Sequence, residues 1–385
     1  MIVRSIRLEN FRNIEQAKLD FSDGINVLIG KNAQGKSNIL EAVYVFAQGK
    51  SFRAKNDREL IRFGEKKAVI SLISKSSKKT RDDELSMEYE SGGTREETKK
   101  TVKKNGVVEK KIGNLLGTFR AVLFCPEHLM LVKGGPAERR TFIDMALCQL
   151  RPVYLKQLQR YYALLSERNK LLKDAKEDRR VYDQTNELWA QQLAECAGYI
   201  TRVRAEYLSM LSSEAEDCFL DMTSGDEKPE FLYKTSTGSE TDAFDEKSVA
   251  DRYFTLYCSE GEKELLAGMT LWGIHRDDMQ ITINGKEARF FASQGQDRSL
   301  VLSMKLAEGR ISEKETGEAP VYLFDDVMSE LDRNRRSFLL EKFKGSSQII
   351  ITSCEPEFFG EGEFRTISVS NGCYSCPEWE GQAVQ

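Results

Sequence analysis

Eight consecutive residues carry the clearest chemical signal in this chain. They match the phosphate-loop pattern G-x-x-x-x-G-K-[ST] at every fixed position, and they are Gly30, Lys31, Asn32, Ala33, Gln34, Gly35, Lys36 and Ser37. Backbone N–H groups of such a loop point at a phosphate, and the N-terminus of the next helix adds about half a positive charge. The pattern assigns Lys36 to the β- and γ-phosphates of ATP and Ser37 to Mg²⁺.

A second group of candidate residues follows the apolar run 321–324, where Asp325 and Asp326 stand side by side. A carboxylate at the end of a strand beside a phosphate loop can hold Mg²⁺ through water, which we assign to Asp325. Asp326 could orient or deprotonate the attacking water. Lys36, Asp325 and Asp326 are therefore the catalytic candidates. Residues 121–127 are a weaker rival for the acidic strand, because they end in a proline and a single acid.

A third candidate site is Ser293, Gln294, Gly295 and Gln296, which open a helix expected over about 296–311. A serine hydroxyl and glycine N–H at a helix N-terminus can bind an anion. Since the chain already has a phosphate loop, this site would serve the γ-phosphate held by a second copy, in an ATP-dependent homodimer. A plain serine N-cap followed by a glycine turn is the alternative, and it stays open.

The elements around the phosphate loop have the order that the motif requires. Residues 25–29 read as a short apolar strand, and residues 38–46 contain no Gly or Pro and read as a helix. Strands are also expected over 2–29, with a hairpin-type turn at Asp23-Gly24, and over 68–73. An ordinary glycine-containing turn between strand and helix is disfavoured by this context.

Further strand and hairpin signals lie on both sides of the middle of the chain. The polar residues 74–111 predict exposed hairpins around Gly92-Gly93 and Asn105-Gly106. Strands are also expected over 279–283, before the hairpin signal Asn284-Gly285, and over 348–353. The last fifteen residues look frayed.

The middle of the chain, residues 136–215, has a helical pattern. One apolar seam runs through Leu155, Leu158, Tyr162, Leu165, Asn169 and Leu172, and another through Trp189, Leu193, Cys196, Ile200, Val203, Tyr207 and Met210. A charged tip, Lys173–Arg180, separates the seams, so we expect a short antiparallel helical hairpin reaching on the order of 30 Å. A plain helical bundle is the alternative. Residues 222–248 read as a loop or connector.

Composition limits the possible functions less than the motifs do. The 385 residues carry a formal net charge of −4, which neither requires nor forbids a nucleic-acid partner. No apolar run could span a membrane, and the N-terminal segment has no signal-peptide pattern. Most of the eight cysteines lie in apolar runs, as reduced thiols do, so a cytoplasmic location is expected. Cys373-x-x-Cys376 lacks the second pair that a zinc ribbon needs.

DNA contacts are the part of the prediction that the residues support least. Lysines cluster around the Asn105-Gly106 turn, and arginines lie at the charged tip; the candidate contacts are Lys103, Lys104, Lys110, Lys111, Arg179 and Arg180. Lys99 and Lys100 belong to the same local patch. The alternative, a strand edge that uses lysines to prevent aggregation, is equally consistent with the pattern.

Several segments together resemble the RecF family of bacterial recombination mediators. They occur in the family's order and cover nearly the whole chain: Leu8–Asn13, Gly30–Ser37, Gly49–Arg53, Asp57–Ile61, Gly135-Pro136 with Arg139-Arg140, His275–Asp278, Ser293–Gln296 and Asp325–Asp332. The resemblance implies an α/β P-loop head of the ATP-binding-cassette type. It would be assembled from both chain ends, residues 1–130 and 268–385, with an inserted α-helical arm over 131–267.

The resemblance also implies a function and partners. Ser293–Gln296 would be a signature motif, and ATP binding would close a head-to-head dimer on double- and single-stranded DNA near gaps. RecR, RecO and RecA-type proteins would be the partners in repair, recombination and replication-fork maintenance after DNA damage. Thr352-Ser353 stand where many cassette ATPases have a histidine, so hydrolysis would be weak and slow and would reset the protein. His275 is more easily explained as structural than as catalytic.

Two other classes of ATPase are alternatives. A chromosome-structure ATPase without a repair role is the main alternative, but that class needs heptads over far longer segments than this chain contains. A motor for a transporter or ribosome factor fits less well, because no membrane span accompanies it and the helical segment is large.

Overall fold

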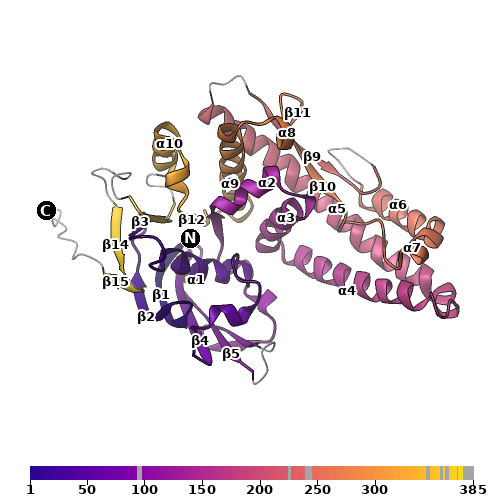
Figure 1. Cartoon of the computed structure of the whole chain (residues 1–385), viewed down its shortest axis with the longest axis horizontal. Helices are drawn as coiled ribbons and strands as arrows, with labels where there is room; N and C mark the ends of the chain where they lie inside the picture. Colours follow the sequence, from indigo (N-terminus) through magenta and orange to yellow (C-terminus); the bar gives the residue numbers. More distant parts are fainter. Residues whose placement is uncertain are drawn as a thin grey trace. The chain divides into compact units, whose positions relative to one another are not determined.

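The computed structural model describes residues 1–92, 98–223, 227–238, 245–343, 347–355, 359, 364–370 and 372–375 (Figure 1). Contacts divide the chain into two compact units. The first consists of Met1–His128 with Glu308–Gln385, and the second is Leu129–Ala307. The first unit thus combines both ends of the chain. The division into 1–130, 131–267 and 268–385 stays a prediction about folding domains.

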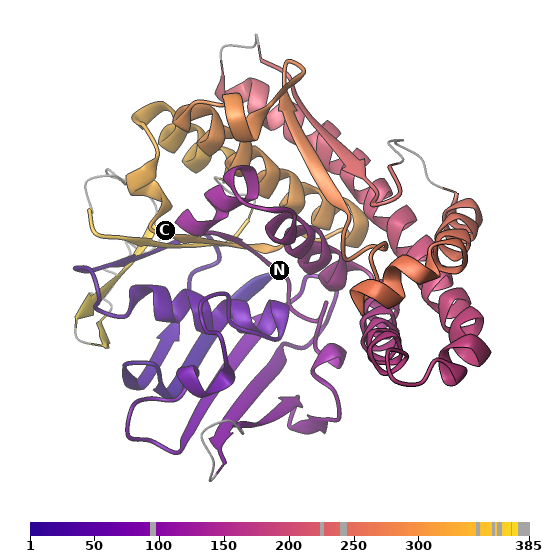
Figure 2. The ribbon, with the colours of Figure 1, turned by 45° about the vertical axis from the view of Figure 1, so that its right-hand side comes forward.

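A mostly parallel sheet forms the centre of the first unit. Its strand order is β15-β14-β3-β13-β12-β8. The strands are β3 (Ile25–Ile29), β8 (Ala121–Phe124), β12 (Val321–Asp325), β13 (Ile349–Ser353), β14 (Phe364–Ser370) and β15 (Cys373–Ser375). Only β15 runs antiparallel to its neighbour. Strands from the two ends of the chain therefore lie side by side (Figure 2, indigo and yellow). Continuous apolar runs are typical of such strands, since both of their faces are buried.

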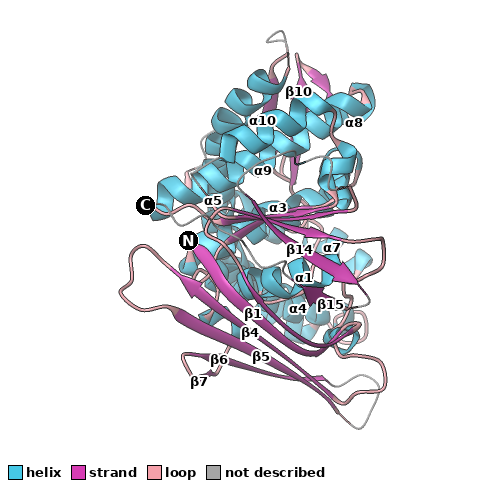
Figure 3. Ribbon diagram, turned by 90° about the vertical axis from the view of Figure 1, so that its left-hand side faces the viewer, coloured by secondary structure: helices cyan, strands magenta, loops and turns pink. Residues whose placement is uncertain are grey.

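A second, antiparallel sheet in the same unit has the order β2-β1-β4-β5-β6-β7. Its strands are β1 (Ile2–Phe11), β2 (Ile14–Asp20), β4 (Lys67–Lys75), β5 (Asp83–Ser91), β6 (Thr98–Lys104) and β7 (Val107–Glu109). The helix α1 (Lys36–Gln48) packs between the two sheets (Figure 3). Asn105 and Gly106 both have positive φ and join β6 to β7, which confirms the predicted hairpin. Gly93 of the other turn signal lies outside the described residues.

The turn at Asp23-Gly24 does not form a hairpin, which corrects the prediction from the sequence. It leads from β2 in the antiparallel sheet to β3 in the parallel sheet. The physical reason is that Val27 and Leu28 are completely buried, and β3 finds parallel neighbours on both sides. A turn signal in the sequence predicts the local backbone conformation, but it does not predict which strands pair.

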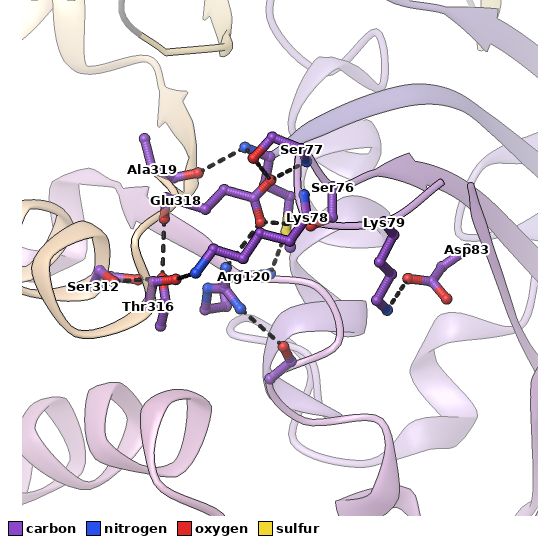
Figure 4. A network of polar contacts seen from close by, with 12 residues as sticks. Ser76, Ser77, Lys78, Lys79, Asp83, Arg120, Ser312, Thr316, Glu318 and Ala319 are labelled. Carbon is purple, nitrogen blue, oxygen red and sulfur yellow. Dashed lines mark hydrogen bonds and ion pairs between the residues drawn. The ribbon is translucent and has the colours of Figure 1, made fainter. Parts of the chain in front are cut away.

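A polar network ties together segments of the first unit that are far apart in the sequence (Figure 4). The Glu318 carboxylate accepts hydrogen bonds from the Ser76 hydroxyl at 2.9 Å and the Ser77 N–H at 2.6 Å, and it pairs with Arg120 at 3.2 Å. Burial alone would raise the pKa of Glu318, but the hydrogen bonds from Ser77 and Ser76 lower it overall. Lys78 donates to the carbonyl of Thr316 beside it. The start of β12 is thereby held against the loop after β4.

Further short elements complete the first unit. The helix α10 (Arg333–Phe343) packs Phe343 against Tyr322 and Phe324 of β12. Single 3₁₀ turns lie at Asp57–Leu60, Ile112–Asn114, Pro126–Leu129 and Val327–Glu330.

The second unit is mainly helical. Its helices are α2 (Met130–Lys133), α3 (Pro136–Leu150), α4 (Pro152–Asp174), α5 (Arg180–Met222), α6 (Glu246–Ser259), α7 (Gly261–Ala267), α8 (Ala288–Phe291) and the start of α9 (Gln294–Thr316). A small antiparallel sheet of order β11-β10-β9 accompanies them, with β9 (Pro229–Lys234), β10 (Asp278–Ile283) and β11 (Lys286–Glu287). Asn284 and Gly285 join β10 to β11, as predicted.

The predicted helical hairpin is present as α4 and α5, but the seam on α4 is only partly correct, since Leu165 and Leu172 are buried as predicted and the other predicted positions are not. The side chains buried on α4 are Tyr154, Tyr161, Leu165, Arg168 and Leu172, whereas Tyr162 is 42% exposed. At one of these positions the apolar pattern failed because an arginine, Arg168, occupies the core in place of the predicted Asn169. Arg168 is completely buried and pairs with the equally buried Glu264 of α7 at 2.6 Å.

Two segments predicted to lack structure contain strands. Residues 222–248 include β9, whose side chains alternate between buried and partly exposed positions as it pairs with β10. The last fifteen residues include β15, which pairs with β14. Cys376, the partner of Cys373 in the sequence motif, lies outside the described residues. Both strands are too short to show a clear period in the sequence.

Candidate functional site

The phosphate loop leaves β3 and enters α1 in the first unit. Gly35 has φ +105° at the N-terminal cap of α1, a left-handed conformation that glycine adopts without strain. Lys36 is only 6% exposed, and its Nζ donates to the carbonyls of Gly30 at 2.6 Å and Lys31 at 2.9 Å. The ammonium group is therefore held inside the loop, where a phosphate would meet it.

Ser37 and Asp325 come together although they lie 288 residues apart. The Ser37 hydroxyl donates to Oδ1 of Asp325 at 2.6 Å, and the Thr352 hydroxyl donates to the same oxygen at 2.9 Å. Parallel pairing explains this meeting, because β3, β13 and β12 lie side by side and their carboxyl ends lie at one edge of the sheet. A hydroxyl and a carboxylate are ligands that Mg²⁺ uses together with nucleotide phosphates. The donor set thus fits the ion.

Asp326 follows β12 in a left-handed conformation, with φ +53°. Its backbone N–H donates to the Thr352 hydroxyl at 2.9 Å. Burial raises the pKa of the Asp326 carboxyl; the charge of Lys36 lowers it, and that of Asp325 raises it again. A raised pKa suits a group that accepts a proton near neutral pH.

Three side chains at this site were not predicted to take part. Thr352 holds both aspartates in place. In the sequence it was noted only as standing where many cassette ATPases have a histidine. The Cys354 thiol donates to Oδ1 of Asn32 at 2.8 Å and accepts from Nζ of Lys36 at 3.3 Å. The Tyr374 hydroxyl donates to the carbonyl of Gly35 at 3.1 Å. Thr352 and Cys354 could have been found from the sequence only by their position at the end of a predicted strand. No signal in the sequence pointed to a role for Tyr374.

The middle of α1 is anchored by an ion pair. Arg12, in the turn between β1 and β2, donates two hydrogen bonds to the fully buried Glu41, at 2.9 and 2.6 Å. Ser51 also donates to this carboxylate. Paired hydrogen bonds of this kind fix orientation as well as distance. They therefore fix the rotation of α1 about its own axis, and α1 is the helix that follows the phosphate loop.

Ser293–Gln296 lie in the second unit, at the start of α9. The Ser293 N–H donates to Oε1 of Gln296 at 2.7 Å, and the Gln296 N–H donates to the Ser293 hydroxyl at 3.2 Å. This reciprocal pair is a capping box. Ser293 and Gln294 are exposed, and the role of the segment as an anion site for a second copy stays a prediction.

The DNA-contact candidates are divided between the two units. Lys103 and Lys104 lie on β6, where Nζ of Lys104 donates to Thr118 at 3.0 Å, and Lys110 and Lys111 are exposed after β7. In the second unit Arg179 pairs with Glu262 and Asp183, and Arg180 pairs with Asp178. Carboxylates therefore offset both arginine charges.

His275 has the structural environment expected from the sequence. Its Nδ1 lies 2.7 Å from the Tyr161 hydroxyl, and its Nε2 lies 3.3 Å from the carbonyl oxygen of Thr270. Burial lowers the pKa of His275 to about 4. The ring is thus neutral near pH 7 and is held by its neighbours.

The parallel sheet, the phosphate loop and the acidic strand end define a P-loop ATPase head of the ATP-binding-cassette type. A family model described as the RecF/RecN/SMC N terminal domain matches residues 2–373. RecF proteins of Acetivibrio thermocellus and Bacillus mycoides are 40% and 38% identical to this chain. The chain belongs to the RecF family.

These similarities extend over nearly whole proteins. The first relative matches over 94% of this chain and 96% of its own length, and the second over 98% and 99%; both are named DNA replication and repair protein RecF. A structure of the recombination mediator RecF with ATP has a TM-score of 0.90 and 34% identity, covering 97% of both chains. An Smc head bound to the C-winged helix domain of ScpA has a TM-score of 0.55 at 16% identity, which shows the fold alone.

Two further kinds of feature are absent from the described residues. None of the helices there is both long and apolar enough to cross a bilayer. No group of three or more His, Cys, Asp or Glu side chains in this part of the chain could hold a metal ion.

Proposed function

We propose that this chain is an ATP-dependent DNA-binding protein of recombinational repair and replication. Lys36 and the loop amides bind the phosphates of ATP, and Ser37 and Asp325 hold Mg²⁺. Asp326 orients or deprotonates the attacking water. The meeting of Ser37 with Asp325 at 2.6 Å carries the proposal, because a nucleotide–magnesium complex needs both groups at one place.

ATP acts as a switch in this proposal. Binding closes a head-to-head homodimer on DNA at junctions of single and double strands, with Ser293–Gln296 of each copy facing the γ-phosphate of the other. Slow hydrolysis resets the dimer, since Thr352-Ser353 end β13 where a γ-phosphate-contacting histidine would otherwise stand. The chain then acts with RecR and RecO to load a RecA-type recombinase, from a cytoplasmic location.

The family relationship supports this role over its alternative. RecF relatives are named for replication and repair, and a related structure is described as part of the RecFOR pathway. A chromosome-structure ATPase would need a long coiled coil. Here the shorter helix of the hairpin, α4, has 23 residues, so the paired part of the hairpin is limited to about 35 Å.

The test of nucleotide binding compares three proteins by calorimetry with ATP and Mg²⁺. Lys36→Ala is expected to abolish measurable binding, because it removes the ammonium group held in the loop. Lys66→Ala removes an exposed lysine elsewhere in the same unit and should bind like wild type. Wild-type affinity in Lys36→Ala would refute the site.

DNA binding is tested separately, by measuring duplex affinity across a salt series with and without ATP. Phosphate contacts predict a linear fall of log K with log salt concentration, with a slope of about −0.9 per contact. Replacing Lys103, Lys104, Lys110 and Lys111 together by alanine should flatten this slope. An unchanged slope would remove these lysines from the interface.

A further inference from the structure

The C-terminal hairpin, β14 with β15, lies directly against the phosphate loop. The Gly372 N–H donates to the carbonyl of Gln34 at 3.1 Å, and the Tyr374 hydroxyl donates to the carbonyl of Gly35 at 3.1 Å. We propose that this hairpin aims the phosphate loop at its anion and that Tyr374 is a positioning residue for the nucleotide. The inference rests on the proposed function, and it adds an element that the phosphate-loop motif does not include.

The planarity of the peptide bond gives the mechanism. In a trans peptide the carbonyl oxygen and the next N–H point in opposite directions within one plane. Holding the Gln34 carbonyl therefore directs the N–H of Gly35, and holding the Gly35 carbonyl directs the N–H of Lys36. The two hydrogen bonds from the hairpin thus fix two consecutive amides of the loop. Consecutive N–H groups of this kind form anion-binding sites.

Gly35 needs this external support more than its neighbours do. A glycine has the widest choice of backbone conformations, and Gly35 has φ +105°. Without a partner on its carbonyl, the peptide could rotate at small cost and turn the amide away. The Asn38 N–H at the start of α1 is a second donor to the same oxygen, at 3.1 Å. The helix and the hairpin therefore hold one peptide between them.

The hairpin also contacts the beginning of the loop. A Cβ atom placed on Gly30 would lie 2.2 Å from the Val369 carbonyl oxygen, so only glycine allows β14 to approach this closely. β14 pairs with β3 from Phe364 to Ser368, and β3 leads into the loop. The supporting strand β14 is therefore hydrogen-bonded to the strand that leads directly into the loop.

The test removes a single oxygen atom. Tyr374→Phe keeps the ring and loses the hydroxyl that donates to Gly35. Ser368→Ala is the matched control, since it removes an exposed hydroxyl from the β14 strand of the same hairpin. The ATP dissociation constant with Mg²⁺ is measured by calorimetry for both variants and wild type, and the melting temperature is measured without nucleotide.

Tyr374→Phe is expected to raise the dissociation constant for ATP about two- to tenfold, the usual effect of one hydrogen bond. The nucleotide-free melting temperature should fall by no more than about 4 °C, because the same hydrogen bond is present without nucleotide. Ser368→Ala should change neither quantity. Wild-type affinity in Tyr374→Phe would overturn the inference, as would a fall in melting temperature that leaves the variant partly unfolded at the temperature of the binding measurement. If wild type itself fails to bind ATP, the proposed function fails instead.

Discussion

At the scale of single residues, Thr352 shows how the two neighbouring aspartates are held in different settings. Its hydroxyl donates to the side chain of Asp325 and accepts from the backbone N–H of Asp326. The Asp325 carboxylate thereby meets Ser37, while Asp326 adopts a left-handed backbone conformation. The proposed division between metal binding by Asp325 and proton transfer by Asp326 depends on this difference.

Asp326→Asn tests the proton-transfer role. The amide keeps the size of the side chain and cannot accept the proton, so ATP turnover should fall by about 10²- to 10⁴-fold. ATP binding should persist, because Lys36 and Ser37 are intact, and an ATP-induced dimer should last longer. Single-turnover hydrolysis and light scattering measure the two effects. Turnover at the wild-type rate would show that another group accepts the proton.

His275 predicts a pH dependence of stability. The unfolded chain binds a proton at this histidine near pH 6.5, whereas the folded chain stays neutral until its pKa of about 4. The unfolded state binds more protons between these values, so the free energy of unfolding falls as the pH drops through the window. The largest contribution is about 3 kcal/mol, from 1.36 kcal/mol for each pH unit.

The measurement is urea unfolding at pH 7 and pH 5, followed by tryptophan fluorescence, for wild type and His275→Gln. The variant has no titrating ring, so it should lose less stability on acidification than wild type does. Equal losses in the two proteins would mean that His275 is not shielded from protons in the folded chain.

At the scale of elements, α4 is held to α7 by a buried ion pair instead of by apolar contacts alone. The Arg168 guanidinium donates to Glu264 at 2.6 Å and to the Thr270 hydroxyl at 2.9 Å, and it lies over the ring of Tyr257. The second oxygen of Glu264 accepts from the Leu271 N–H at 2.9 Å. Both charges are thus paired and hydrogen-bonded, the condition under which burial is tolerated.

Breaking this pair from one side should be costly. Arg168→Met leaves the Glu264 carboxylate buried without its cation, and we expect a loss of about 3–5 kcal/mol in the free energy of unfolding. Replacing Glu264 by leucine as well should recover part of that loss. Arg180→Ala, which removes an exposed and solvent-screened ion pair with Asp178, should leave the free energy of unfolding nearly unchanged. A double variant no more stable than Arg168→Met would contradict this explanation.

At the scale of the whole molecule, the two ends of the chain build one nucleotide-binding unit. Met1–His128 supplies the phosphate loop, and Glu308–Gln385 supplies both aspartates, Thr352 and the supporting hairpin. Neither part contains a complete site. The Ser293–Gln296 segment belongs to the other unit, and its proposed ligand is the nucleotide of a second copy.

Ser293→Arg tests that arrangement. The larger cation should block approach of a second copy while leaving the ATP affinity of the single chain at the wild-type value, because Ser293 has no place in the phosphate loop. Sedimentation with ATP, and with ATP plus gapped duplex, would then show a monomer where wild type dimerises. A normal ATP-induced dimer would contradict the proposed contact.

The sequence alone determined the local features of this protein. Gly30–Ser37, the strand before it and the helix after it were all predicted, because the motif states its own geometry within about twenty residues. Other local features were also predicted: the acidic end of β12, the hairpins at Asn105-Gly106 and Asn284-Gly285, and the two long helices. Each depends on neighbouring residues along the chain.

Only the tertiary structure decided which distant segments meet. The sequence-based prediction gave β3 the wrong pairing partner. It also missed the burial of Arg168, the strand β9 and the support that Tyr374 gives to the phosphate loop. Each depends on a partner that lies far away along the chain, such as Glu264 for Arg168 and Gly35 for Tyr374. Residue spacing reports the period of one element, but the free energy of a buried charge or an open strand edge depends on what packs against it.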